Sequence, residues 1–396
     1  MVREVVIASA ARTPIGVFLG SLKDVPPMQL MASAAKKAMD NIGLKPEQVD
    51  QVIAGMCYPE AQGGNPARQV QGLLGIPWEP AYAVTVNQAC GSAMRGFDIA
   101  TQEIMLGKCD VVIAGGMESM SQVPYALTRG REGYRLGVPD AGIMDILLKD
   151  GLICAMEKYH MGVTAENLAD EYQISREEQD ELAEISHARA IAAIKSGRFK
   201  DEYAPVEIVT RKGTKLFEVD ENPKEGTTRE SIGKMPPAFK KGGTITAGNA
   251  SSLNDGGSAV VLMSAEKAKE LGIKPMAKVR STCSYGVPPR VMGIGPAFAI
   301  PLLLKYAGLA QDQIDLFEIN EAFAAQFLAV NRVLNIPMDR CNLNGSGIGL
   351  GHPVGSTGVR IIVSLLYEMQ KQNSKYGVAS LCCGGGPTTA VCVERI

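Results

Sequence analysis

The chain has 396 residues, of which 46% are hydrophobic and 21% charged, and a formal net charge of −2. This length predicts roughly two or three domains, and the charge excludes the broad basic face that nucleic acid requires. Because no apolar run reaches the roughly 18 residues of a membrane helix and no leader pattern begins the chain, we expect a soluble, cytoplasmic protein that takes a small molecule.

Cysteine usage indicates the redox compartment. The chain has nine cysteines, an odd number, and they do not show the paired spacing of a zinc site. A chain of this length does not need disulfides to stabilise its core. We therefore expect free thiols in a reducing compartment and no metal site.

Short β-branched runs alternate with helical patterns, which predicts an α/β protein with mostly buried strands. The predicted strands, in chain order, are 5–10, 52–54, 83–86, 111–114, 277–282, 316–319 and 378–381. The predicted helices are about 27–41, 91–106, 177–196 and 355–371. Ser175 and Glu178 form a capping box for the third helix, and Gly197 marks its end. His187, within this helix, is predicted to be a solvated surface residue.

An internal repeat relates the two ends of the chain. GLKPEQVDQVIAG at 43–55 matches GLAQDQIDLFEIN at 308–320, and VVIAGGMES at 111–119 parallels VASLCCGGG at 378–386, at nearly the same shift. Two matches at nearly the same shift are hard to obtain by chance. They predict two similar α/β halves that pack against each other.

The repeat and the composition divide the chain into three parts. Residues 1–120, completed by 251–271, form the predicted N-terminal half, and residues 272–396 form the C-terminal half. Between them, 121–250 is richer in charge and turn residues. This segment is therefore predicted to be an inserted loop domain.

Two residues stand where chemistry is a good reason for their placement. Cys90 lies in VTVNQACGSAMRG, where a strand pattern changes to a helical one, and a helix N-terminus there would lower the pKa of the thiol. His352, one of only three histidines, lies in the glycine-rich stretch NGSGIGLGHPVGSTGVR. From placement alone, Cys90 can also be a small buried hydrophobe and His352 an incidental polar residue.

These motifs and the surrounding sequence resemble the thiolase family of acyl-CoA acetyltransferases. The resemblance covers essentially the whole chain, from EVVIASAARTPIG to CGGGPTTAVCVERI. It implies a fold of two similar halves in five alternating layers (αβαβα). It also implies that Cys90 is the acylated nucleophile and that His352 takes its proton and hydrogen-bonds to an oxyanion.

The adjacent pair Cys382 and Cys383 presents a choice of register. In the family the second catalytic cysteine is followed by one residue and then by Gly-Gly-Gly, which selects Cys382 as the base for the attacking acetyl group. Alternation along a strand places the two side chains on opposite sides, so Cys383 is expected to be buried without a role. Gly384 matches the position whose N–H joins that of Cys90 in one oxyanion hole.

The resemblance also assigns residues that contact the substrate. Asn320 in NEAFAAQ is implied to hold a water that forms a second oxyanion hole with His352, although an Asn after a strand is more commonly a turn or cap residue. Five positions are implied to contact the substrate or coenzyme A: His160, Met161, Ser251, Phe323 and, at the nucleotide end, Lys224.

The favoured function is a reversible condensation of two acetyl-CoA to acetoacetyl-CoA and CoA, without a further cofactor. YHMG at 159–162 favours this short-chain group. The alternatives are a degradative 3-ketoacyl-CoA thiolase of longer chains and a noncatalytic CoA- or lipid-binding homologue. A decarboxylating condensing enzyme would need a second histidine in place of Asn320. The resemblance also implies a homodimer or homotetramer, because paired sheets leave an edge that needs cover.

Overall fold

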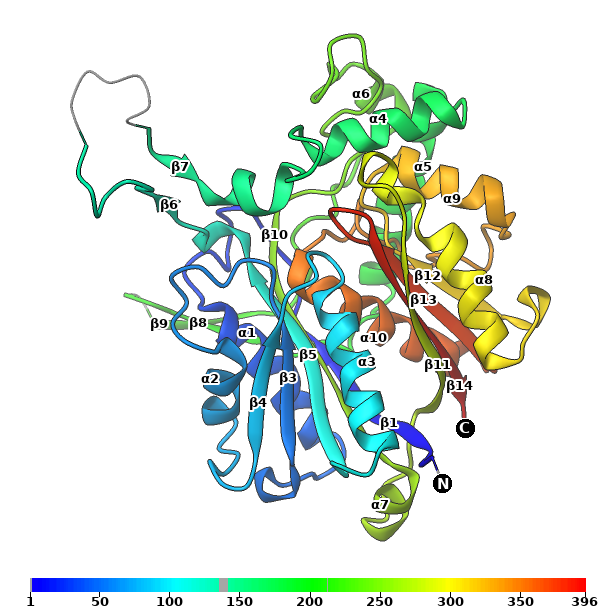
Figure 1. The fold of residues 1–396 in the computed structure, drawn as a ribbon. Helices are drawn as coiled ribbons and strands as arrows, with labels where there is room; N and C mark the ends of the chain where they lie inside the picture. Colours follow the sequence, from blue (N-terminus) through cyan, green and yellow to red (C-terminus); the bar gives the residue numbers. More distant parts are fainter. Residues whose placement is uncertain (1, 135–141, 212) are drawn as a thin grey trace.

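Each half of the chain forms a twisted sheet with helices on both of its faces (Figure 1). The computed structural model describes residues 2–134, 142–211 and 213–396. In the first half the strand order is β4 (Tyr82–Val86), β3 (Gln51–Gly55), β5 (Val111–Ser119), β10 (Asn254–Ser264) and β1 (Val5–Arg12). In the second half it is β12 (Leu316–Ile319), β13 (Tyr376–Cys382), β14 (Pro387–Arg395) and β11 (Ala277–Gly286).

The helices complete the five-layer arrangement that the resemblance predicts. One outer layer holds α1 (Pro27–Asp40) and α2 (Pro66–Leu73), the other holds α8 (Pro296–Ala307), and α3 (Ser92–Met105) and α10 (Val354–Gln372) lie between the sheets. Helix α10 is buried on nearly every face, as a helix enclosed between two sheets must be. A Cβ at Gly358 would lie only 2.6 Å from the backbone nitrogen of Met94, so the glycine allows α10 to approach α3.

The strand pairings repeat between the halves, as the sequence repeat predicts. Strand β3 pairs in parallel with β4 and β5, and its counterpart β12 pairs in parallel with β13. In place of β4 the second half has a single parallel bridge from Phe317 to Cys341. The two sheets also meet through a two-residue antiparallel ladder, Val6 with Lys278 and Ile7 with Ala277. With the two-residue strand β2 (Gly16–Val17), which pairs with β10, this junction makes one ten-stranded sheet, a feature that the sequence patterns did not predict.

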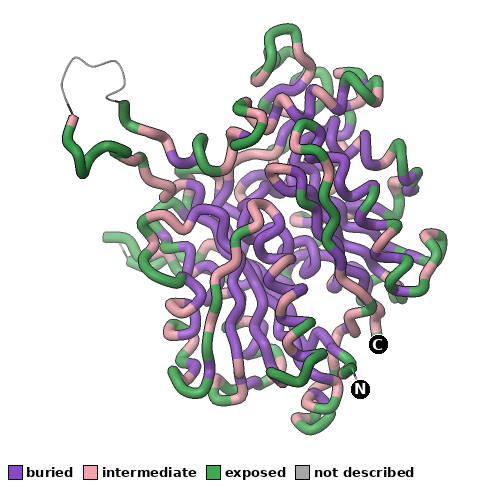
Figure 2. The backbone as a smooth tube through the Cα atoms, in the orientation of Figure 1, coloured by how far each residue is buried: buried purple, intermediate pink, exposed green. Residues whose placement is uncertain are grey.

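Strand β10 lies in the first sheet between β1 and β5, and α7 (Ala265–Glu270) follows it. Both elements come from residues 251–271, the segment predicted to complete the N-terminal half. The boundaries of the three predicted parts remain predictions. The burial map shows the strands of both sheets and the central helices enclosed by the outer elements (Figure 2). Within the described residues, helices are too short or too polar to cross a lipid bilayer.

The predicted loop domain carries mostly short elements. They are β6 (Tyr125–Ala126), β7 (Met144–Asp145), η3 (Leu148–Leu152), α4 (Met161–Glu171), α5 (Arg176–Lys195), β8 (Val206–Thr210), β9 (Gly213–Phe217) and α6 (Arg229–Gly233). Most of them lie above the sheets, and the hairpin of β8 and β9 lies beside α1 (Figure 1). The capping box of Ser175 and Glu178 is present at the start of α5. Helix α9 (Ala324–Leu334) of the second half packs against α4, α5 and α8.

The prediction that His187 is a solvated surface residue is wrong. His187 is 8% exposed, and its Nδ1 accepts a hydrogen bond from the backbone N–H of Lys224 at 3.4 Å. Burial, with a smaller effect of the Lys224 charge, lowers its pKa to about 4. The charged pattern of α5 did not reveal that the chain near Lys224 covers this side of the helix.

Candidate active site

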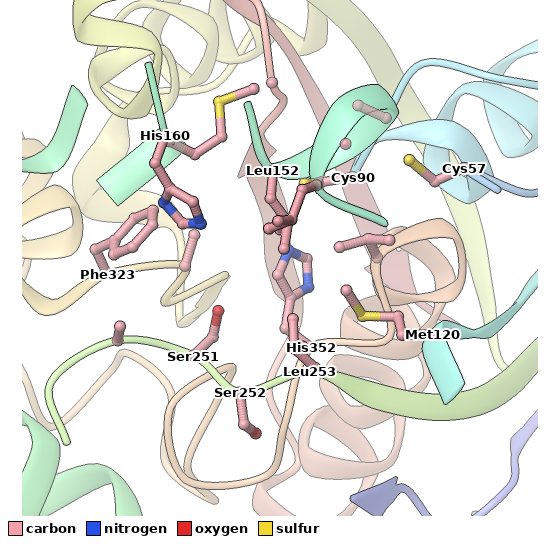
Figure 3. Close-up of a pocket in the computed structure, with 18 of the residues that line it drawn as sticks. Cys57, Cys90, Met120, Leu152, His160, Ser251, Ser252, Leu253, Phe323 and His352 are labelled. Carbon is pink, nitrogen blue, oxygen red and sulfur yellow. The ribbon is translucent and has the colours of Figure 1, made fainter. Parts of the chain in front are cut away.

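A cavity of about 440 Å³ is lined by residues of the two halves and of the predicted loop domain. It is lined by seven of the ten predicted site residues: Cys90, His352, Gly384, His160, Met161, Ser251 and Phe323. Cys90 and His352 lie next to each other in the close-up view, and His160 and Phe323 lie to one side of them (Figure 3). The chain therefore brings together residues from both halves and from the predicted loop domain.

Cys90 is held in a tight turn between β4 and α3. Ala89 has a φ of +48°, the left-handed region that residues with a Cβ rarely adopt. The Oγ of Ser92 stabilises the turn, because it accepts the N–H of Gln88 at 2.9 Å and donates to the carbonyl of Ala89 at 2.6 Å. This strained turn presents the Cys90 side chain to the cavity at the N-terminus of α3.

The thiol of Cys90 does not have the lowered pKa that its placement predicted. Burial raises its pKa to about 11, and hydrogen bonds from the N–H groups of Gly384 and of Cys90 itself offset this rise only in part. The sequence revealed the helix N-terminus but not the desolvation around the sulfur, which is the larger effect. Cys90 is therefore a neutral thiol at rest and needs a base. The same two N–H groups therefore point at the Cys90 sulfur.

The side chain of His352 is oriented as a base. Its Nδ1 lies 2.7 Å from the Oγ1 of Thr357, and that hydroxyl donates to the carbonyl of Pro353 at 2.9 Å. Because the Thr357 hydroxyl already donates its proton to Pro353, it can only accept a hydrogen bond from Nδ1. Nδ1 must therefore carry the imidazole proton, which leaves a lone pair on Nε2. Nε2 is buried, and no described protein group hydrogen-bonds to it. Burial, assisted by the charge of Arg360, lowers the pKa of His352 to about 3, so the ring is neutral.

Cys382 and Cys383 are both fully buried, and their side chains have different surroundings. Cys382 ends β13 and belongs to the apolar cluster that includes Met292 and Phe323, two residues of the cavity wall. The sulfur of Cys383 lies against Gly91, where a Cβ would be only 2.4 Å away. Cys382 does not itself line the cavity. Burial raises the pKa of both thiols, and the charge of an ionised Cys90 raises it further.

Asn320 directly follows β12 and is fully buried behind the cavity wall. Its backbone N–H donates to the carbonyl of Ser380 at 3.0 Å, which continues the ladder between β12 and β13. Neither polar atom of its side-chain amide has a hydrogen-bond partner among the described protein groups. A Cβ at Gly347 would lie 2.7 Å from its Oδ1, so the His352 loop packs closely against it. The amide therefore has free capacity to bind a small polar group.

His160 caps α4 and lines the cavity opposite His352. Its Nδ1 accepts the N–H of Gly162 at 3.0 Å, and its ring stacks on Phe239 with 4.5 Å between the centroids. Burial lowers its pKa, so the neutral ring carries its proton on Nε2 and can donate a hydrogen bond. Met161 packs on Gly384, since a Cβ there would lie 2.8 Å from the methyl group of Met161.

Ser251 and Phe323 are joined by backbone pairing. The N–H of Ser251 donates to the carbonyl of Ala322 at 2.9 Å, and Ala250 bridges to Phe323, so the chain at the predicted end of the loop domain and the second half share one wall. Lys224 lies away from this wall and is exposed. Its proposed contact with the nucleotide end of CoA stays a prediction.

Glu118 is a buried group beside the cavity that the sequence analysis did not single out. Its carboxyl accepts the N–H groups of Cys57 at 2.9 Å, Tyr58 at 3.2 Å and Gly355 at 2.9 Å. Burial raises its pKa to about 8, although these hydrogen bonds oppose the rise. Glu118 thus connects the end of β3 to the segment that follows His352. Its only signal in the sequence is its place at the end of the repeated strand VVIAGGMES.

Comparisons with known proteins cover the whole chain. The thiolase N-terminal domain family matches residues 5–266, and the thiolase C-terminal domain family matches residues 273–395. An acetyl-CoA acetyltransferase of Syntrophomonas wolfei is 50% identical over all of both chains. The crystal structure of the Bacillus anthracis acetyl-CoA acetyltransferase superposes with a TM-score of 0.97 at 44% identity, covering 100% of this chain and 99% of that one. Human mitochondrial 3-ketoacyl-CoA thiolase in complex with CoA gives 0.95 at 42% identity, covering 100% and 98%. The chain belongs to the thiolase family.

Proposed function

We propose that this chain is an acetyl-CoA C-acetyltransferase, which reversibly condenses two acetyl-CoA to acetoacetyl-CoA and CoA through an acetyl-cysteine. The observation that carries the proposal is the pairing, in one cavity, of a neutral thiol beside two N–H donors with a neutral imidazole whose Nε2 is free. The name of the Syntrophomonas wolfei relative, which matches over its full length, supports the same activity.

In the first half-reaction the sulfur of Cys90 attacks the carbonyl carbon of acetyl-CoA while Nε2 of His352 removes its proton. The N–H groups of Cys90 and Gly384 stabilise the oxyanion. The C–S bond to CoA then breaks, and the departing CoA sulfur takes the proton of Cys382. Acetyl-Cys90, a protonated His352 and a Cys382 thiolate remain.

In the second half-reaction the Cys382 thiolate removes an α-proton from the second acetyl-CoA. Burial raises the pKa of this thiol, which makes its thiolate a stronger base. The protonated His352, with a water held by the Asn320 amide, stabilises the enolate oxygen. The enolate carbon attacks acetyl-Cys90, acetoacetyl-CoA forms, and the released Cys90 thiolate regains its proton from His352.

Thiolysis of a ladder of 3-ketoacyl-CoA esters by free CoA tests the proposed activity. We expect kcat/KM to be highest for the four-carbon ester, acetoacetyl-CoA, with two acetyl-CoA as the product. A higher kcat/KM for the six- or eight-carbon ester would identify a degradative thiolase of longer chains. No turnover of any ester would contradict both activities.

The two adjacent cysteines are expected to differ when each is replaced by alanine. Cys382→Ala should still accept an acetyl group on Cys90 but should lose exchange of the α-protons of acetyl-CoA with solvent, by about 10²–10⁴-fold, because the base is gone. Cys383→Ala removes a sulfur that packs on Gly91 and should keep activity within about threefold of wild type. Deuterium incorporation into acetyl-CoA, measured by mass spectrometry, distinguishes the two variants. Loss of deuterium incorporation in Cys383→Ala and not in Cys382→Ala would assign the base to Cys383.

We also propose that the chain self-associates through β4. This strand is the edge of the first sheet, and it leaves Tyr82 45% and Val84 39% exposed. An unpaired apolar edge is a site for pairing with a second copy. Light scattering is expected to give at least a dimer for wild type and a smaller mass for the Tyr82→Lys, Val84→Lys double variant. Val209→Lys, on the exposed β8 strand, is the control that should keep the wild-type mass. A wild-type monomer with full activity would contradict the proposal.

We also propose that the protein is cytoplasmic, as its composition predicts. The nine cysteines, all within the described residues, are free thiols, which suits a reducing compartment.

A further inference from the structure

The cavity has two chemically different ends, with Cys90 and His352 between them (Figure 3). On one side lie His160 and Ser251, which are half-buried and offer polar groups. On the other side lie Cys57 and Met120, which are 5% and 2% exposed. The first end is therefore less enclosed and offers polar groups to a pantetheine arm with two amides. The second is closed and apolar.

Tyr58 closes the second end. It follows β3 and is 2% exposed, and its hydroxyl donates to the carbonyl of Leu147 at 2.9 Å. Gly151 packs directly against the ring, since a Cβ on Gly151 would lie 1.7 Å from the Tyr58 oxygen. Both Tyr58 and Gly151 line the cavity. The ring thus fills the space between the first half and the η3 segment.

The surroundings of Tyr58 form a separate apolar cluster next to the nucleophile. Its buried members are Cys57, Tyr58, Met120, Ile146, Leu147 and Val354. Ala89 and Cys90 pack against it. An acyl group on the Cys90 sulfur therefore has this cluster on its closed side, and the N–H groups of Cys90 and Gly384 lie beside the sulfur to receive its one carbonyl oxygen.

We infer that the ring of Tyr58 is the stop that sets the length of the acyl chain carried by Cys90. The inference rests on the proposed acyl transfer and adds the residue that restricts it to short chains. A chain longer than the space before the ring must displace Tyr58, which is held by the Leu147 carbonyl on one side and by the backbone of Gly151 on the other. One methylene in an apolar pocket changes specificity by about 10–200-fold, so a single wall residue is sufficient.

The test compares kcat/KM for four-, six- and eight-carbon 3-ketoacyl-CoA in wild type, Tyr58→Ala and Tyr58→Phe. Tyr58→Ala is expected to raise the ratio of the six-carbon to the four-carbon value by at least about 10-fold. Tyr58→Phe keeps the ring and should keep this ratio within about threefold of wild type. Tyr306→Ala, which removes an exposed tyrosine of α8, is the matched control with an unchanged ratio.

An equal loss of activity at every chain length in Tyr58→Ala would overturn the inference, because it would make Tyr58 only a structural tie. Equal broadening in Tyr58→Phe would also overturn it, because the hydroxyl and not the ring would then be the barrier. If Tyr58→Ala does not fold, Tyr58→Leu makes the same comparison. If wild type cleaves no ester, the proposed function fails. The rates at which acetyl-, butanoyl- and hexanoyl-CoA acylate Cys90 in wild type and variant, read by intact mass, still decide the role of the ring.

Discussion

Replacing Cys90 with serine is expected to abolish acetyl transfer, with kcat reduced by at least about 10³-fold. The serine hydroxyl is a weaker nucleophile than sulfur, and the His352 imidazole must remove a far less acidic proton. Wild type mixed with acetyl-CoA should gain one acetyl group by intact-mass spectrometry, and Cys90→Ser should gain none. The buried turn around Ala89 and Ser92 accommodates a serine of similar size, so the variant should fold.

Cys57 provides the matched control for Cys90. It also lines the cavity as a thiol, but it lacks the turn and the two N–H donors that surround the Cys90 sulfur. Cys57→Ser should therefore still gain one acetyl group. Acetylation that survives in Cys90→Ser and disappears in Cys57→Ser would assign the nucleophile to Cys57, which follows β3, and would refute the mechanism.

The sequence predicted the fold well because its signals are local. Strand and helix periodicity located the layers, and the match of 43–55 with 308–320 predicted that β3 and β12 are equivalent. Backbone contacts between segments that carry no matching sequence pattern could not be predicted in this way. The ladder between β1 and β11 depends on how the packed halves approach each other, and the bridge from Phe317 to Cys341 depends on how a loop of the second half packs against β12.

The site was predicted only where a motif carries the chemistry. Cys90 and His352 were located by motifs, but Glu118 and Thr357 act through backbone and side-chain partners that no local pattern reveals. The pKa of Cys90 was predicted wrongly for a related reason, because desolvation depends on how the assembled chain surrounds the thiol. Desolvation reversed the expected pKa shift of Cys90, and it lowers the pKa of the buried His187.

Replacing His352 with glutamine should slow acetylation of Cys90 by about 10²–10⁴-fold near pH 7. Burial raises the pKa of the Cys90 thiol to about 11, so only about one molecule in 10⁴ is a thiolate at pH 7 without a base. The lowered pKa of His352, about 3, keeps the imidazole neutral and able to accept the proton across the physiological range. Stopped-flow mixing with acetyl-CoA and quenched mass spectrometry measure this rate.

The pH dependence separates a base from a merely structural histidine. Between about pH 6 and 9 wild type should acetylate at a nearly constant rate, because the thiol stays protonated below about 11 and the imidazole stays neutral above about 3. In His352→Gln the rate should rise about tenfold per pH unit, because it follows the thiolate fraction of Cys90. Thr357→Ser keeps the hydroxyl that holds Nδ1 and should retain the flat profile, whereas Thr357→Val should lose part of the rate. A flat profile in His352→Gln would show that Cys90 ionises without His352, and the thiol–imidazole mechanism would have to be abandoned.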